Sequence, residues 1–182
     1  MITNRAYIKI DNIKYIPMLN EILNNSFENA DIHWENDIAF FTTFDNDAFH
    51  FQLSKISSMI FQDFPIKLSI LIVPFFNDIF KKYFSFINND VVTISDVFLK
   101  NIDNEIVKKD AKKIQNMIEK NDLDTLRAFL MCNANSCSTA NELFIHRNTL
   151  NYRVEHLEKT TNINIRDLNT LIFIKLILNI CA

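Results

Sequence analysis

Glycine is absent from this chain of 182 residues, although average usage would supply roughly 13. Several ligand-binding motifs depend on glycine, because it lets the backbone approach a ligand closely or adopt a positive φ at little cost. Its absence therefore excludes a phosphate-binding P-loop, a dinucleotide-binding fingerprint, a glycine-rich kinase loop and a nucleophile elbow. Asparagine is the next most tolerant residue of the left-handed region. We expect it in turns at Asn24-Asn25, Asn88-Asn89 and Asn133-Ala134-Asn135.

Cysteine is scarce and long apolar runs are missing. The three cysteines, Cys132, Cys137 and Cys181, match no zinc-ligand spacing, so we expect reduced, partly buried thiols. No run approaches the ~18–20 apolar residues of a transmembrane helix, and the first residues do not resemble a secretory signal. These features predict a cytoplasmic protein that contacts no membrane and carries neither a metal nor another cofactor.

A large excess of charge of either sign is also missing. The chain has 19 Lys and Arg against 22 Asp and Glu, a net charge of −3. The whole chain therefore lacks the basic footprint that is typical of nucleic-acid-binding proteins. Its C-terminal third differs slightly, because residues 123–182 carry six basic and five acidic side chains. This asymmetry alone decides nothing about function.

Apolar periodicity divides the chain into a mixed N-terminal part and a helical C-terminal part. Alternating or β-branched segments predict strands at 6–10, 32–34, 38–43, 66–73 and 91–97. Stripes at helical spacing predict helices at 13–27, 48–61 and 76–87. The first six elements follow the β-α-β-β-α-β order of a ferredoxin-like split βαβ fold.

Only helical patterns occur from Asn104 onward. A helix over Ile106–Glu119 has lysines on one side, which fits either a nucleic-acid-binding face or a solvated linker helix, and the linker is favoured. We therefore expect an α+β chain. It would comprise an α/β sandwich over residues 1–103 for regulation or dimerisation, a linker helix over 104–121 and an all-α domain over 122–182.

Residues 123–161 have the spacing of a helix-turn-helix. A helical stripe ends at Asn133, a short helix beginning near 136–138 follows, and Ile145-His146-Arg147 forms a tight connection. The next helix, over 147–161, has Leu150, Val154 and Leu157 on one face. Asn148, Tyr152 and Glu155 then point the other way, with Thr149, Asn151 and His156 at the flanks.

The polar face of this second helix has the chemistry of a DNA-reading surface. In a groove-reading helix, the first residues reach base edges and flanking side chains hold phosphates. Asn can pair with adenine through two hydrogen bonds, and Arg with guanine. Any amphipathic helix has a polar outside, however, so the pattern alone leaves DNA binding and a solvated face equally open.

The residue string itself resembles a known family. Residues 126–130 read L-R-A-F-L, and after Asn135 and Ala140 residues 143–154 read L-F-I-H-R-N-T-L-N-Y-R-V. This resembles the C-terminal helix-turn-helix of PucR/CdaR-type bacterial transcription regulators, typically T-L-R-A-Y-L, then N, then A-x-x-L-F-V-H-R-N-T-L-x-Y-R-L. The resemblance covers roughly residues 122–182. Asn151 stands where the family often has Arg, and Cys137 where it usually has Ser.

The resemblance implies a sequence-specific DNA-binding regulator that works as a homodimer on double-stranded DNA, under an unidentified small-molecule or protein effector. In this family a degenerate GGDEF-like domain often precedes the reader, and the N-terminal strand order is compatible with one. No Gly-Gly pair is present, so no cyclase activity is carried over. The DNA-binding residues that the resemblance and the helix face imply are Ser138, Thr139, His146, Arg147, Asn148, Thr149, Asn151, Tyr152 and Arg153.

Other interpretations stay open at this point. The chain could be an adaptor that binds no DNA and pairs with or sequesters other regulators through its α/β domain. The last helix, Leu168–Ile180, is apolar on more than one face, which fits core burial or a dimer seam.

An enzyme is disfavoured. His33, His50, Asp45, Asp47 and Glu35 have no known ligand or acid–base spacing and fit a polar turn better. The aromatic run Phe40, Phe41, Phe44, Phe49 and Phe51 fits plain core better than a ligand cavity.

Overall fold

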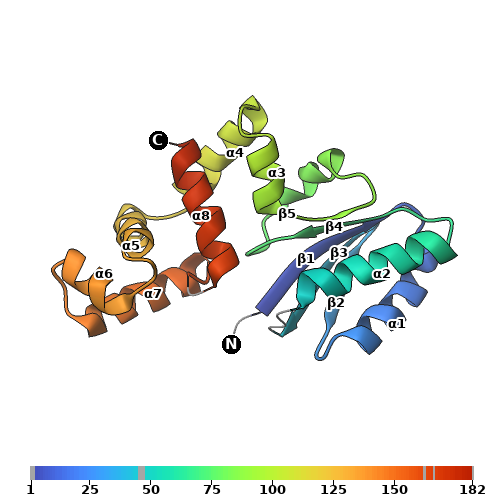
Figure 1. Cartoon of the computed structure of the whole chain (residues 1–182), viewed down its shortest axis with the longest axis horizontal. Coiled ribbons are helices and arrows are strands. Elements are labelled where there is room, and N and C mark those ends of the chain that lie inside the picture. Colours follow the sequence, from blue (N-terminus) through green and yellow to red (C-terminus); the bar gives the residue numbers. More distant parts are fainter. Residues whose placement is uncertain (1–2, 45–47, 162, 166, 182) are drawn as a thin grey trace. The chain divides into compact units, whose positions relative to one another are not determined.

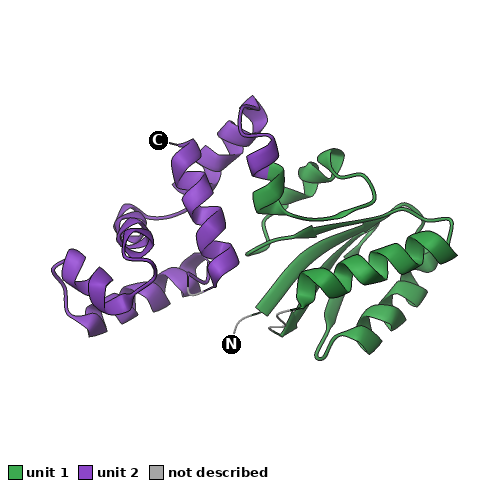
Figure 2. Cartoon of the chain, in the orientation of Figure 1, with its two compact units in different colours: residues 1–97 green, residues 98–182 purple. Residues whose placement is uncertain are grey.

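The structure, a computed structural model, describes residues 3–44, 48–161, 163–165 and 167–181. The chain divides into two compact units, Met1–Val97 and Phe98–Ala182 (Figure 2). Unit 1 is a sheet covered by helices and unit 2 is helical, so the α+β fold class is confirmed.

Unit 1 is built on a five-stranded sheet of order β2-β3-β1-β4-β5. The strands are β1 (Thr3–Ile10), β2 (Asp31–Glu35), β3 (Ile38–Phe44), β4 (Leu68–Ile72) and β5 (Val91–Thr93). β1 lies between β3 and β4 and is antiparallel to both, while β5 joins β4 in parallel. The first four strands thus have the arrangement of the expected split βαβ fold.

The sheet has a different cover on each face. Figure 1 shows α1 (Ile16–Ser26) and α2 (Phe49–Asp63) on one face. Successive side chains of a strand point to opposite faces of the sheet. Ile8 of β1 and Phe41 of β3 belong to the core between the sheet and these two helices. On the other face Tyr7 meets Phe40, with ring centroids 5.1 Å apart. Two 3₁₀ helices complete the unit: Ile13–Tyr15, and Asp78–Phe86, where residues 76–87 were expected to form an α-helix.

The expected strand over 91–97 is wrong beyond Thr93. β5 ends there and α3 (Ile94–Lys100) begins. The cause is a capping box, in which two residues satisfy each other's free backbone N–H groups. Thr93 Oγ1 accepts from the N–H of Asp96 at 3.1 Å, and the Asp96 carboxylate accepts from the N–H of Thr93 at 3.4 Å and from its hydroxyl at 2.7 Å. A run of β-branched residues hid this helix start.

Asparagine takes most of the left-handed positions, as the missing glycine predicts. Asn29, Asn36, Asn89 and Asn133 have φ between 51° and 57°. Asn24 and Asn25 do not, because they lie inside α1, so that expectation is wrong. Two residues of other types, Ala134 and Phe144, also have positive φ, and both lie in the helix-turn-helix region.

Unit 2 contains α4 (Glu105–Asn116), α5 (Lys120–Met131), α6 (Ser136–Glu142), α7 (Arg147–Thr161) and α8 (Leu168–Ile180). α5, α6 and α7 pack on one another, and α4 packs on α8. Residues 104–121 therefore lie within a packed unit, whereas the sequence suggested a separate linker. Phe173 of α8 is buried edge-to-face against Phe98, while Leu168 and Ile172 stay exposed.

Candidate nucleic-acid interface

The turn between α5 and α6 is closed by its own backbone and by Asn135. Asn133 and Ala134 are left-handed, and the N–H of Ala134 donates to the Phe129 carbonyl at 2.8 Å. The Asn135 side chain accepts from the N–H of Ser138 at 2.9 Å, which caps the start of α6. The helix therefore begins at Ser136, at the edge of the expected range, with an asparagine as its cap.

The turn between α6 and α7 places Phe144 in an unusual state. This residue has φ of 53° and its side chain is 96% exposed. A bulky residue is rare in the left-handed region, where the conformation costs roughly 1–2 kcal/mol. The turn is held by the N–H of Ile145, which donates to the carbonyl of the buried Ala140 at 2.9 Å. Sequence reasoning missed Phe144; the absence of glycine from a turn that often contains it was the available signal.

His146 caps the N-terminus of α7. Its Nδ1 accepts from the N–H of Asn148 at 3.2 Å, and its carbonyl accepts from the N–H of Leu150 at 3.1 Å. Only the neutral tautomer with a free lone pair on Nδ1 can accept this bond. His146 was expected to contact DNA directly; the structure gives its ring a defined local role in fixing the first turn of the helix.

The rotation of α7 is as the sequence predicts. Leu150, Val154 and Leu157 are buried, and the helix packs on α5 and α6. On the opposite face Tyr152 is 69% exposed and its ring stacks on His156, with centroids 6.3 Å apart. The helix thus presents an apolar stripe inward and a polar face outward.

Most of the expected DNA-binding residues share this outward surface. Ser138, His146, Arg147, Asn148, Thr149 and Tyr152 are exposed, and Asn151 and Arg153 are half-buried. Thr139 is the exception. It is fully buried, and its hydroxyl donates to the Asn135 carbonyl at 2.8 Å. The expectation that Thr139 contacts DNA is therefore wrong, because its side chain closes the first turn of α6 instead.

A buried carboxylate lies beneath the outer part of α7. Asp122, in the first turn of α5, is 5% exposed, and its Oδ2 lies 3.9 Å from Nδ1 of His156. Burial raises the pKa of Asp122, since the charged form loses water, while the nearby charges of His156 and Arg153 oppose that rise. The acid therefore couples α5 electrostatically to the helix that carries the exposed polar face.

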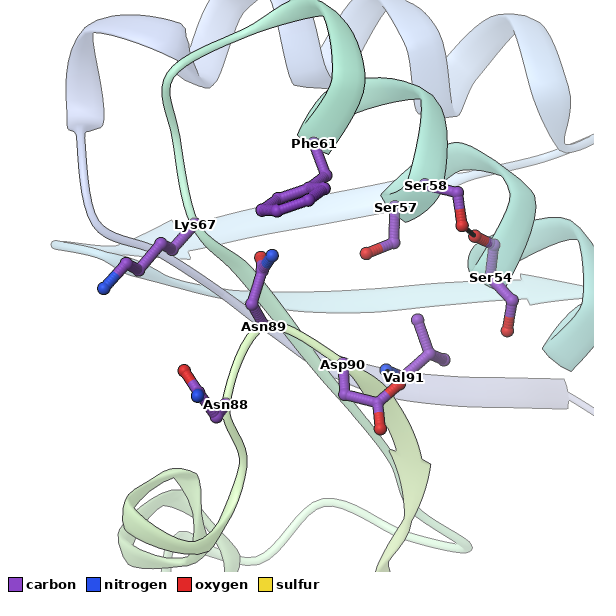
Figure 3. Close-up of a pocket in the computed structure, with 9 residues that line it drawn as sticks. All are labelled: Ser54, Ser57, Ser58, Phe61, Lys67, Asn88, Asn89, Asp90 and Val91. Carbon is purple, nitrogen blue, oxygen red and sulfur yellow. Dashed lines mark hydrogen bonds between the residues drawn. The ribbon is translucent and has the colours of Figure 1, made fainter.

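Unit 1 has a polar hollow of about 520 Å³ between α2 and the residues that precede β4 and β5 (Figure 3). Three serines of α2 face Lys67, Asn88, Asn89 and Asp90 across it. The side-chain Oδ1 of Asn89 already has a partner within the protein, because it accepts from the backbone N–H of Leu68 at 2.7 Å. Lys67 and Asp90 carry opposite charges, so the lining of the hollow attracts neither anions nor cations selectively.

The described residues give no support to an enzyme or to a ligand cavity lined by the aromatic run. In the described ranges, no three His, Cys, Asp or Glu side chains are grouped to hold a metal ion. Asp45 and Asp47 lie outside the described residues. Phe41 and Phe49 stack in the core, and Phe40 packs on the opposite face of the sheet, so these rings line no common cavity. Among the described helices, none is both long and apolar enough to cross a membrane.

Comparison with known proteins bears on the same helices. Residues 122–180 match the family described as the PucR C-terminal helix-turn-helix domain. The proline-responsive transcriptional activator PutR of Bacillus subtilis is 42% identical over 48 residues, which cover 26% of this chain and 12% of that protein.

A solved structure, the regulator of polyketide synthase expression from Bifidobacterium adolescentis, aligns with 98% of this chain and 80% of its own, at 11% identity and a TM-score of 0.45. The family match spans α5 to α8, whose short α6, tight turn and capped α7 have the geometry described above. Residues 122–180 thus match the PucR C-terminal helix-turn-helix domain, whose model covers about a third of this chain.

Proposed function

We propose that this chain is a cytoplasmic, sequence-specific DNA-binding transcription regulator of the PucR/CdaR type that reads the major groove with α7. The observation that supports this best is the outward face of α7, which combines a cation, amides and an exposed tyrosine on a helix whose other face is buried. PutR is named as a transcriptional activator, which agrees with regulation of transcription as the task.

The proposed roles follow from position on the helix. Asn148 and Asn151, near the start of α7, face base edges, where an amide can pair with adenine. Arg147 and Arg153 contact phosphates, and Thr149 supports them through a phosphate or a thymine methyl. His146 acts by holding the first turn in place through the Asn148 N–H.

The proposed active form is a homodimer. The reading domain carries little net charge, so one copy gains little electrostatic attraction to DNA. Two copies on two half-sites, ~34–36 Å apart, double the contacts. Leu168 and Ile172 are exposed apolar residues on α8 that can serve as part of the dimer contact.

Mobility-shift assays on fragments selected from the host genome test the proposal. Arg147→Ala should weaken binding to all sequences and lower the salt dependence by ~1 in log–log slope. Lys109→Ala, an exposed lysine on α4, is the matched control and should leave affinity unchanged. Equal binding by wild type and Arg147→Ala, with unchanged circular dichroism, would contradict the proposal and favour the adaptor that binds no DNA.

A further inference from the structure

A groove of about 580 Å³ lies in unit 2 between the C-terminal ends of α4, α5 and α8. This volume falls within the ~300–1,000 Å³ of small-molecule sites. Leu130, Met131 and Leu178 supply apolar surface, and Met131 is 73% exposed. An apolar ligand group that packs on this exposed side chain would remove apolar surface of both partners from water, which favours binding.

The charged side chains that line this groove are all basic. Arg127 of α5 and Lys175 of α8 line it, and none of the described lining residues is acidic. Lys112 of α4 adds a third cation, close enough to Cys181 to oppose the rise that burial causes in the pKa of that thiol. Asp124 meets Arg127 at 3.6 Å, but both side chains are about half exposed, so this pair is weak.

The groove borders the turn that positions α6. Leu130 and Met131 form the last turn of α5, and Asn133 is the left-handed residue that follows. The N–H of Asn133 donates to the Leu130 carbonyl at 3.3 Å. A molecule that contacts Leu130 and Asn133 therefore touches the segment from which the first helix of the helix-turn-helix starts.

We propose that this groove binds a small organic anion with an apolar body, such as an aromatic or medium-chain carboxylate. The apolar body packs on Leu130, Met131 and Leu178, and the anionic group pairs with Arg127 and Lys175. Binding itself is independent of the proposed function. Its consequence, a ligand-dependent change in DNA affinity transmitted through the α5–α6 turn, rests on that function.

Fluorescence titration of the full chain with 8-anilinonaphthalene-1-sulfonate tests binding without DNA. This probe is an aromatic anion whose emission rises when it leaves water. We expect one saturable site per chain, and at least a tenfold weaker dissociation constant in the double variant Arg127→Gln/Lys175→Gln. Lys67→Gln removes one cation beside the polar hollow of unit 1 (Figure 3) and should leave the affinity unchanged. The uncharged analogue N-phenyl-1-naphthylamine should bind wild type and the double variant alike.

Met131→Glu gives a second, independent arm. Met131 is exposed, so the fold should survive, which an unchanged melting temperature would verify. The new carboxylate should abolish the saturable site. Equal sulfonate affinity in wild type and the double variant would overturn the proposal. A site that disappears as the protein concentration rises would also overturn the proposal, since a second copy of the chain would then be the occupant.

Discussion

Three single residues in the helix-turn-helix carry conformations or charges that a sequence pattern hides. Phe144 takes a left-handed backbone state with its ring in solvent, His146 caps α7 with a ring nitrogen, and Asp122 is buried with its carboxylate. For each of them, a substitution can be tested by its effect on protein stability in the absence of DNA. Predictions at this scale therefore concern the folding of the domain itself.

Replacing Phe144 by Asn should stabilise the free protein. Asn tolerates the left-handed region far better than an aromatic residue does, and the exposed ring makes little packing contact that could be lost. We expect a gain of about 1 kcal/mol in the free energy of unfolding, out of the roughly 1–2 kcal/mol that the conformation costs. Urea unfolding measures this. A loss of stability would mean that the ring packs on the protein.

His146→Ala should destabilise the domain by about 0.5–2 kcal/mol, the usual cost of a lost N-cap. His146→Asn should retain most of the stability, because Asn is among the strongest capping residues. Thermal melts at neutral pH compare the two. If both variants melt alike and below wild type, the imidazole matters for a reason other than the bond to the Asn148 N–H.

Asp122 should make stability fall as the pH rises. Its pKa is raised above 3.8 in the folded state by burial, so the folded chain holds this proton more tightly than the unfolded chain does. Protonation then favours folding, and the contribution is lost as the pH rises from about 3.8 through the raised pKa. Asp122→Asn should remove this dependence.

The control for Asp122→Asn is Asp124→Asn, an exposed carboxylate on the same helix. Urea unfolding at several pH values checks both variants. The same pH slope in Asp122→Asn as in wild type would contradict the assignment to this carboxyl group.

At the scale of the element, apolar periodicity located most helices and strands but not all of their ends. Long amphipathic stripes were reliable: α7 has its three expected apolar residues buried. Ends set by side-chain hydrogen bonds were not. Thr93 and Asp96 start α3 inside a run that reads as a strand, and Asn135 takes the capping role among several short polar neighbours. Such bonds depend on individual atoms, which periodicity does not register.

The candidate site shows the same limit. Exposure of Asn148 and Tyr152 followed from rotating a helix about its apolar stripe, whereas burial of Thr139 did not, because it lies on a helix of only seven residues. A helix of seven residues spans only about two turns, so it has too few apolar positions to show from the sequence which side faces inward. The capping bond of His146 could be recognised only from the structure, since the sequence motif does not distinguish a capping residue from a DNA-contacting one.

Truncating the α7 stripe should be costly. Leu150→Ala or Leu157→Ala removes a fully buried side chain, and such changes cost about 2–5 kcal/mol. Tyr152→Ala, on the outward face of the same helix, should cost far less. Denaturant unfolding distinguishes them. Equal losses at Leu150 and Tyr152 would mean that the helix is rotated differently.

At the scale of the whole molecule, the family match concerns only the helical part, and the task of unit 1 stays a prediction. A regulatory or dimerising α/β domain, GGDEF-like or otherwise, agrees with its split βαβ sheet but is not required by it. The proposed dimer predicts a mass in light scattering of twice 21.4 kDa or a higher multiple. A strict monomer at the concentrations that bind DNA would contradict it.

The central claim is that α7 reads sequence, and selection of bound genomic fragments by wild type and Asn148→Ala tests it most directly. The wild type should enrich a two-fold repeated site, and Asn148→Ala should relax the preference at one position in each half-site, by about 1–3 kcal/mol of discrimination. Enrichment of no sequence by the wild type, or an identical preference in the variant, would contradict the account.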